Sequence, residues 1–349
     1  MASVPTPPSL EGDSRWSPAI ATVSLGAAHL HPITAKIKAA ARNGQRGLEL
    51  FHDDLAEFAK MLRCQTYRRR ARHSRSMRRA GVHILALQPF RHYEGLLDPA
   101  QHAQRIDELK HWVRLCQILG DDLFILIPSS FLDPSMITGD RDRLVADLAE
   151  AADVASPVRI AYEALAWGTY VNTWEDCWDI VVRANRPNLG ICLDTFNIAA
   201  RVWADPTSGT GRLPAHADDD LQASMERLVR KIDPDRVMMV QLADGERVDP
   251  HTPFLQAPGL PKLLAWSRNA RLFPCEEERG GYLPIREVAE ACLNGLGYTG
   301  WVSMEVFSRT LGEDNPLVPD EHAARASRSW QRVLQQLDNR AEKVQPIIP

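Results

Sequence analysis

The chain has 349 residues, of which 44% are hydrophobic and 25% are charged, and its formal net charge at pH 7 is -4. This composition is that of an ordinary globular protein, and the length is compatible with one large domain. The weak negative charge gives no support for a nucleic-acid partner, and no apolar run is long enough to cross a bilayer, so we expect neither nucleic-acid nor membrane partners.

The first 18 residues are polar and rich in proline, without an apolar core of signal-peptide length. We therefore predict a disordered leader over residues 1–18, a folded domain over 19–340 and a flexible tail over 341–349. The chain has no C-x-x-C spacing among its cysteines, which are Cys64, Cys116, Cys177, Cys192, Cys275 and Cys292. This pattern indicates reduced thiols and a cytoplasmic location rather than a disulfide framework or a zinc ribbon.

Eight short apolar runs recur along the chain, separated by helix-like stretches. Each run is almost continuously hydrophobic, as expected of parallel strands buried on both faces. The runs cover residues 19–26, 46–51, 83–90, 122–129, 158–165, 189–197, 236–244 and 301–308. Eight strand–helix units predict a single (β/α)8 TIM barrel, and a doubly wound open sheet is the alternative. No glycine-rich phosphate-binding motif follows any run.

The helices between the runs carry recognisable end signals. After the third run, Asp98 is a plausible N-cap and Gly120 a plausible stop, and residues 321–338 form the last predicted helix. Two segments break the pattern. The basic run at 68–81 is best explained as a solvated helix face. The connection from 245 to 283 is long, and in a barrel it would lie on the face that carries active sites.

Four consecutive predicted strands each carry one oxygen-bearing side chain near the C-terminal end, where barrels place their catalytic groups. These residues are Glu163, Asp194, Gln241 and Glu305. A carboxylate in an apolar strand is unfavourable unless it is paired, hydrogen-bonded or bound to a metal. Each residue could separately meet an arginine or cap a helix. As a set, three crowded carboxylates call for a divalent cation, and oxygen ligands favour Mg²⁺, Mn²⁺ or Co²⁺ over structural zinc.

The segments around these residues resemble the 3-dehydroshikimate dehydratases, a group of xylose-isomerase-like TIM barrels, and several are most similar to the fungal quinate-catabolic members. The resemblance runs in order from about Ala19 to Gln335 through ATVSLG, GLELFHDDLAEFA, LQPFRHYEGLLD, AYEALAWGTYVNTWE, RPNLGICLDTFNIAAR, VQLAD, AWSRNARLFP and GWVSMEVFSR. It implies conversion of 3-dehydroshikimate to protocatechuate by loss of water, with a bound divalent metal. It also implies that the four oxygen-bearing residues are the metal ligands.

The resemblance further implies that Arg91, Ser267 and Arg271 hold the substrate and its carboxylate. An arginine fork can bind a carboxylate through two parallel hydrogen bonds. If the segment around Ser267 is helical, Ser267 and Arg271 face the same way. Two features depart from the family. Asn197 stands where some bacterial relatives have histidine, which questions a proton-transfer role there, and an arginine-rich stretch at 61–80 replaces the usual second helix, through divergence or a gene-model error.

The implied reaction also needs a base and an acid beside the Lewis-acid metal. His52, just after the second run, is the first candidate for the base, with Glu49 and a metal-bound water as alternatives. Two other functions stay open: a sugar isomerase or epimerase of the same barrel group, and a non-catalytic barrel that binds a related metabolite. An isomerase of neutral sugars should lack the arginine clamp. The sequence leaves the physiological metal and the presence of a homo-oligomer undecided.

Overall fold

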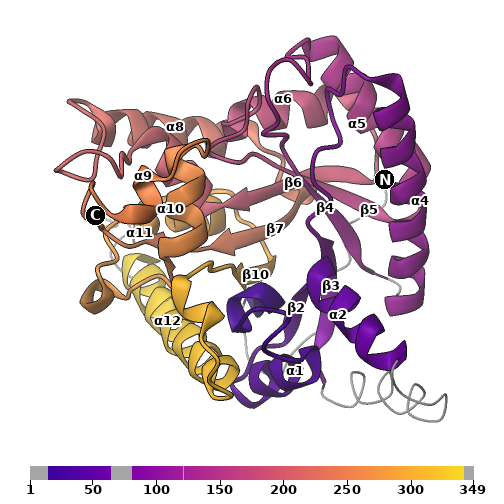
Figure 1. Cartoon of the computed structure of the whole chain (residues 1–349). Coiled ribbons are helices and arrows are strands. Elements are labelled where there is room, and N and C mark those ends of the chain that lie inside the picture. The colour runs from indigo at the N-terminus through magenta and orange to yellow at the C-terminus, as the bar shows by residue number, and fades with distance from the viewer. Residues whose placement is uncertain (1–14, 64–80, 121, 342–349) are drawn as a thin grey trace, which may run out of the picture.

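The structure, a computed structural model, describes residues 15–63, 81–120 and 122–341. Eight parallel strands close into a barrel, in the order β1-β10-β7-β6-β5-β4-β3-β2 (Figure 1). They are β1 (Trp16–Ala21), β2 (Gly47–Phe51), β3 (His83–Gln88), β4 (Phe124–Pro128), β5 (Arg159–Glu163), β6 (Leu189–Asp194), β7 (Val237–Leu242) and β10 (Gly300–Met304). The predicted (β/α)8 barrel is confirmed. The open sheet is wrong, because β1 pairs with both β10 and β2.

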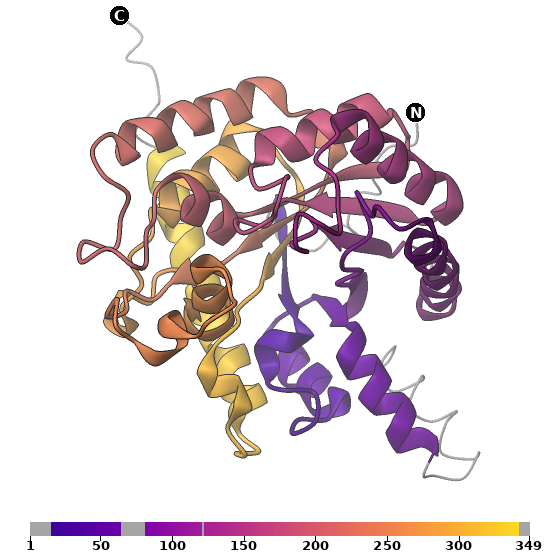
Figure 2. The same ribbon diagram turned by 45° about the horizontal axis from the view of Figure 1, so that its top comes forward.

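Helices surround the strands, as the turned view in Figure 2 shows. They are α1 (Ile33–Arg42), α2 (His52–Arg63), α4 (Pro99–Leu119), α5 (Arg141–Ala155), α6 (Trp174–Ala184), α7 (Thr195–Val202), α8 (Ala217–Lys231), α9 (Pro253–Gln256), α10 (Lys262–Ala270), α11 (Ile285–Glu290) and α12 (Val318–Ala341). The predicted ends of α4 are confirmed: Asp98 accepts the N–H of Ala100 at 2.8 Å, and Gly120 follows the last turn. Across the described ranges, no helix combines the length and apolarity needed to cross a membrane.

The barrel interior contains an apolar cluster that explains where the polar side chains point. Its members include Ala161 on β5, Cys192 on β6 and Met239 on β7. Side chains alternate between the two faces of a strand, so residues two positions later point to the same side. Glu163, Asp194 and Gln241 are each two residues beyond these members. They therefore point into the barrel directly above the apolar cluster, at the C-terminal ends of the strands.

The observed strands are shorter than the apolar runs, and the first one is shifted. β1 begins at Trp16, so residues 16–18, which were predicted to belong to the leader, are part of the barrel. Residues 22–25 were expected in this strand but form a 3-10 helix. The Thr22 side chain accepts the N–H of Phe51 at 3.0 Å. A side-chain hydrogen bond therefore stands here in place of a backbone hydrogen bond between β1 and β2. Residues 1–14, 64–80 and 342–349 lie outside the described part, and with them Cys64, most of the basic run and nearly all of the predicted tail.

The long connection between β7 and β10 is folded. It contains α9, α10 and a short antiparallel ribbon of β8 (Asp244–Gly245) with β9 (Arg271–Leu272). The ribbon fixes the backbone at Arg271, and α10 carries Ser267 just before it. A loop of this length in a compact domain is usually functional, and this one brings two of the predicted substrate-binding residues to the C-terminal end of the barrel.

Candidate functional site

The structure brings the predicted metal ligands together at the C-terminal end of the barrel. Glu163, Asp194 and Glu305 each offer a carboxylate oxygen, and these oxygens lie within 4.8 Å of one another. Gln241 faces Asp194 in the register of β6 and β7, and its side chain is fully buried. We call these four residues the floor cluster. Three carboxylates and one carboxamide form an all-oxygen donor set, which fits a hard divalent cation.

The charge of the floor cluster is only partly compensated by protein groups. Arg271 Nη1 donates to Asp194 Oδ2 at 2.8 Å and to Glu305 Oε2 at 3.2 Å. Asn197 Nδ2 donates to Glu163 Oε1 at 3.0 Å and to Asp194 Oδ2 at 2.7 Å. Burial nevertheless raises the pKa of Glu163 well above its usual range, with the Glu305 and Asp194 charges adding to the effect. Burial also raises the pKa of Glu305 to about 7. A bound cation would reverse these shifts, because it favours the ionised carboxylates.

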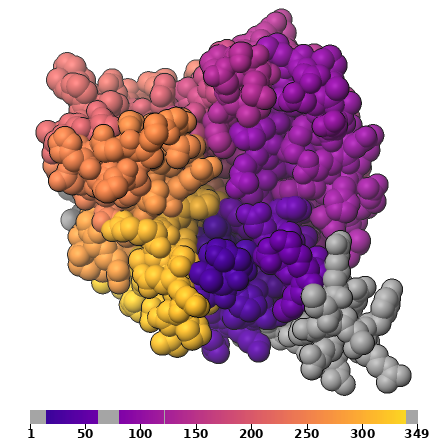
Figure 3. Space-filling view, in the orientation of Figure 1, coloured from indigo at the N-terminus to yellow at the C-terminus, as the bar shows by residue number. Residues whose placement is uncertain are grey.

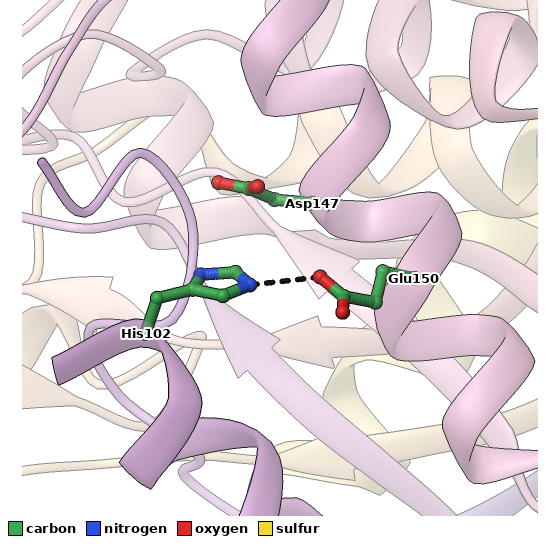
Figure 4. A group of neighbouring side chains, drawn as sticks. All are labelled: His102, Asp147 and Glu150. Carbon is green, nitrogen blue, oxygen red and sulfur yellow. Dashed lines mark hydrogen bonds and ion pairs between the residues drawn. The ribbon is translucent and has the colours of Figure 1, made fainter. Parts of the chain in front are cut away.

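A second acidic group lies on the outside of the barrel, between α4 and α5 (Figure 4). His102 Nε2 lies 2.7 Å from Glu150 Oε2. The Asp147 carboxylate already has two partners: its Oδ2 accepts the Gly95 N–H at 2.8 Å and its Oδ1 accepts from Arg143 Nε at 2.8 Å. These contacts tie the β3–α4 loop to α5, so this group forms a structural network between the two segments.

A cavity of about 500 Å³ opens above the floor cluster. Its base is formed by acidic and amide side chains, its walls are aromatic and aliphatic, and two exposed arginines stand in its lining. The base consists of Glu163, Glu305 and Gln88, the walls include Phe131, Trp167, Leu264 and Phe307, and the arginines are Arg91 and Arg268. Figure 3 shows this face hollowed between the orange segment with α10 and the purple and indigo N-terminal segments. The cavity is therefore negative at its base and positive toward the solvent.

Ser267 and Arg271 lie together, as the helical spacing predicts. Arg271 Nε donates to Ser267 Oγ at 2.9 Å, and the guanidinium lies 4.2 Å from the centroid of the Phe196 ring. Both side chains line the cavity and are almost fully buried. Arg271 is in direct contact with two members of the floor cluster, whereas its predicted role was to meet the substrate away from the metal. Arg271 thus borders both the floor cluster and the cavity.

Arg268 and Trp167 are two cavity residues that the sequence did not single out. In the described chain, the Arg268 and Arg91 guanidinium groups have no hydrogen-bond or ion-pair partner, and the buried Trp167 Nε1 has no hydrogen-bond partner. The Arg268 charge contributes, after burial, to lowering the pKa of Arg91, so two like charges face one cavity. Arg268 directly follows Ser267, and Trp167 is four residues past Glu163. Proximity to the predicted site residues was the one signal available for both.

The three proton-transfer candidates occupy different places. His52 is the first residue of α2 and stacks on Trp112, with ring centroids 4.8 Å apart. His52 lines a neighbouring cavity, and Arg91 lines both this cavity and the one above the floor cluster. Glu49 is fully buried inside the barrel, next to the floor cluster, and does not line the cavity. Asn197 bridges two carboxylates through its amide nitrogen, and its Oδ1 accepts the Ala166 N–H at 3.0 Å, so all its polar atoms are used in holding the site.

The cysteines are expected to be dispensable for any chemistry at this site. Burial raises the pKa of all five described thiols, to about 12 for Cys116 and about 11 for Cys275. The thiolate is the reactive form, so buried thiols of this kind react slowly. The folded protein should keep most of its activity after treatment with a thiol reagent. Complete inactivation that bound substrate prevents would contradict this prediction.

Comparisons with known proteins identify relatives of the whole barrel. The family model described as xylose isomerase-like TIM barrel matches residues 37–334. A 3-dehydroshikimate dehydratase of Neurospora crassa is 42% identical over 339 residues, which is 91% of this chain and 94% of that protein. A 3-dehydroshikimate dehydratase of Pseudomonas aeruginosa is 32% identical over 297 residues, and this match spans 83% of the chain but 38% of the relative.

Two solved structures extend the comparison to three dimensions. A xylose isomerase-like TIM barrel/4-hydroxyphenylpyruvate dioxygenase fusion protein superposes with a TM-score of 0.72 at 28% identity, covering 96% of this chain and 46% of that one. The IOLI protein with a bound zinc atom gives a TM-score of 0.68 at 18% identity, covering 92% and 99%. The second likeness shows the shared fold.

Proposed function

The chain belongs to the xylose isomerase-like TIM barrel family and, within it, to the 3-dehydroshikimate dehydratases, and from this premise we propose that it removes water from 3-dehydroshikimate to give protocatechuate. The proposal is carried by one observation: a single cavity has a cluster of buried carboxylates at its base and unpartnered arginines toward solvent. The substrate has the matching polarity, with neutral ring oxygens at one end and a carboxylate at the other.

We propose Glu163, Asp194, Gln241 and Glu305 as the residues that would hold a divalent cation, with Mg²⁺, Mn²⁺ and Co²⁺ as the expected metals. When bound, such an ion supplies Lewis-acid polarisation of the ketone and hydroxyl oxygens of the substrate. Asn197 holds Glu163 and Asp194 at their present separation through the hydrogen bonds given above, and Arg271 contacts Asp194 and Glu305. The aromatic walls of the cavity exclude water from the ring, which strengthens every polar interaction inside.

The substrate is proposed to enter with its ring oxygens toward the floor cluster and its carboxylate toward Arg91. Ser267 and Arg271 line the same cavity, and we propose that they hold the substrate together with Arg91, with the Arg271 guanidinium also facing its carboxylate. His52 remains our candidate for the base, since the cavity that it lines adjoins the substrate cavity at Arg91. A base that acts at the substrate must come within hydrogen-bond reach of the proton it removes.

Arg268 is expected to contribute to substrate binding as a second cation for the carboxylate. Arg268→Ala should raise KM about tenfold or more while kcat changes little, because an exposed charge contributes mainly to capture and binding. Metal affinity should be unchanged, since Arg268 has no contact with the floor cluster. Arg286, an exposed arginine outside the cavity, gives the matched control as Arg286→Ala. An unaltered KM in Arg268→Ala would leave the carboxylate to Arg91 and Arg271.

The alternative functions are distinguished by one optical assay. Protocatechuate is aromatic and absorbs in the near ultraviolet, whereas the substrate does not have an aromatic ring. Purified protein with added Mg²⁺, Mn²⁺ or Co²⁺ should generate this absorbance from 3-dehydroshikimate. Conversion of a neutral sugar or inosose without any product from 3-dehydroshikimate would indicate an isomerase. Saturable binding of 3-dehydroshikimate without turnover would indicate a non-catalytic barrel, and either result would overturn the proposal.

A further inference from the structure

Glu49 lies next to the floor cluster inside the barrel, in a place that the proposed reaction does not use. It lies in the middle of β2, its side chain is fully buried, and it does not line the substrate cavity. Its Oε2 accepts two hydrogen bonds from amide nitrogens, one from Gln241 Nε2 at 2.7 Å and one from Gln88 Nε2. These two glutamines come from β7 and β3, so one carboxyl group joins three strands of the barrel.

The two amides lead from Glu49 to two members of the floor cluster. Gln241 is itself one of the proposed ligands. Gln88 Nε2 also donates to Glu305 Oε1 at 3.2 Å, so it links Glu49 to a second ligand. Each proposed ligand must present oxygen to a cation, because a carboxamide nitrogen has no lone pair available for a metal. A glutamine ligand therefore depends on which way its amide is turned.

The Glu49 carboxylate, which accepts from Gln241, determines the orientation of the Gln241 amide. An acceptor oxygen at this position attracts the amide NH2 and repels the amide carbonyl oxygen. With the nitrogen of Gln241 held by Glu49, its Oε1 is the atom left for a cation. Among the described residues its one partner is the weak donor Cys192 Sγ at 3.4 Å, a member of the apolar cluster, so no strong protein donor competes for this oxygen. The opposite amide orientation would set two oxygen acceptors against each other in a buried site, which is unfavourable.

We propose that Glu49 is a positioning residue for the metal site: it turns Gln241 so that the carboxamide oxygen serves the cation, and through Gln88 it fixes Glu305. This inference rests on the metal site of the proposed function and deepens it. It also separates Glu49 from proton transfer, since a group that touches no substrate has no proton to remove. Outer contacts of this kind orient metal ligands and tune affinity in other metal sites.

The test compares two substitutions of Glu49 by direct titration of the metal-stripped protein with Mn²⁺, in the absence of substrate. Glu49→Gln keeps an acceptor oxygen and Glu49→Leu removes it. We expect Glu49→Leu to weaken Mn²⁺ binding about 10–100-fold. Glu49→Gln should keep the affinity within about threefold and lower kcat by less than about tenfold, far less than the 10²–10⁴-fold effect of removing a general base.

Glu94→Leu is the matched control, because Glu94 is equally buried in the same barrel and accepts hydrogen bonds from the Ser130 N–H and Tyr162 Oη away from the floor cluster. It should lower the melting temperature and leave Mn²⁺ binding unchanged. If Glu49→Leu does not fold, Gln88→Leu serves as the second variant. It removes the amide that links Glu49 to Glu305 and should still weaken Mn²⁺ binding.

Two results would overturn the inference. One is unchanged Mn²⁺ affinity in both leucine variants, Glu49→Leu and Gln88→Leu. The other is loss of turnover in Glu49→Gln with intact Mn²⁺ affinity, which would make Glu49 the base. Failure of the wild-type protein to make protocatechuate would overturn the proposed function instead, because the Mn²⁺ titrations need no substrate.

Discussion

Removal of divalent metal with a chelator is expected to abolish turnover, and addition of Mg²⁺, Mn²⁺ or Co²⁺ is expected to restore it. The reason is the concentration of negative charge at the base of the cavity. Glu163, Asp194 and Glu305 bring three carboxylates within 4.8 Å, while Arg271 supplies one positive charge among them. Buried like charges without compensation are strongly unfavourable. Full activity in protein shown to be free of metal would contradict this prediction.

Substitution of the ligands tests the same point residue by residue. Glu163→Ala and Glu305→Ala each remove a charged oxygen of the proposed ligand set, and each should weaken metal binding by about 3–5 kcal/mol, as expected when one partner of a buried ionic contact is lost. Glu150→Ala is the control, because Glu150 belongs to the second acidic group between α4 and α5. It should leave metal binding and activity unchanged. In metal-free protein, Glu163→Gln should not lower stability, since burial and neighbouring carboxylates already disfavour the Glu163 charge.

The floor cluster could be predicted because strand geometry alone determines it. Glu163 interrupts an apolar run, and Asp194 and Gln241 occupy equivalent places in the next two runs. Parallel strands of a barrel end at the same rim. Residues near their C-terminal ends therefore lie close together, independently of the length and sequence of the helices between the strands. The strand ends themselves were set too late, because the runs continue past the last paired residues: Thr22 to Leu25 form a 3-10 helix instead of extending β1.

The surroundings of the cluster depend on contacts that leave no local mark in the sequence. Arg271 reaches Asp194 through a two-residue ribbon, and nothing in the loop sequence indicates that pairing. His52 follows a strand, which suggested an active-site residue. The structure adds that α2 begins at this residue, that its ring stacks on Trp112 of α4, and that it lines a cavity which shares Arg91 with the site. Glu49 looked like an alternative base from its strand position. Only the structure shows that Gln88 and Gln241 cover it.

Arg271→Ala is expected to lower kcat/KM by a factor that corresponds to about 2–5 kcal/mol, the loss typical when one partner of a buried charge pair is removed. The substrate carboxylate must leave water to enter the cavity, and an unpaired buried carboxylate is unfavourable. Arg271 is 1% exposed and lines the same cavity as Arg91. Arg271→Lys should also be impaired, because it keeps the charge but loses the planar fork that now contacts Ser267, Asp194 and Glu305.

Arg325 offers a matched control for the loss of a buried arginine. It is 8% exposed and pairs with Glu276 at 2.6 Å, away from the cavity. Arg325→Ala should lower the melting temperature and leave kcat/KM close to that of the wild-type protein. A similar fall in kcat/KM for both variants would mean that the Arg271 effect is a loss of folding stability rather than of substrate binding.

The metal titration of Arg271→Ala decides between two roles for this arginine. Nη1 shares Asp194 and Glu305 with the proposed cation, and two positive charges on the same carboxylates repel each other. Removing the guanidinium should therefore leave metal affinity intact or increase it, while kcat/KM falls. A fall in both would instead show that Arg271 serves mainly to hold Asp194 and Glu305 in ligand geometry. An unchanged kcat/KM would assign the substrate carboxylate to Arg91 and Arg268, the two arginines of the cavity that have no protein partner in the described chain.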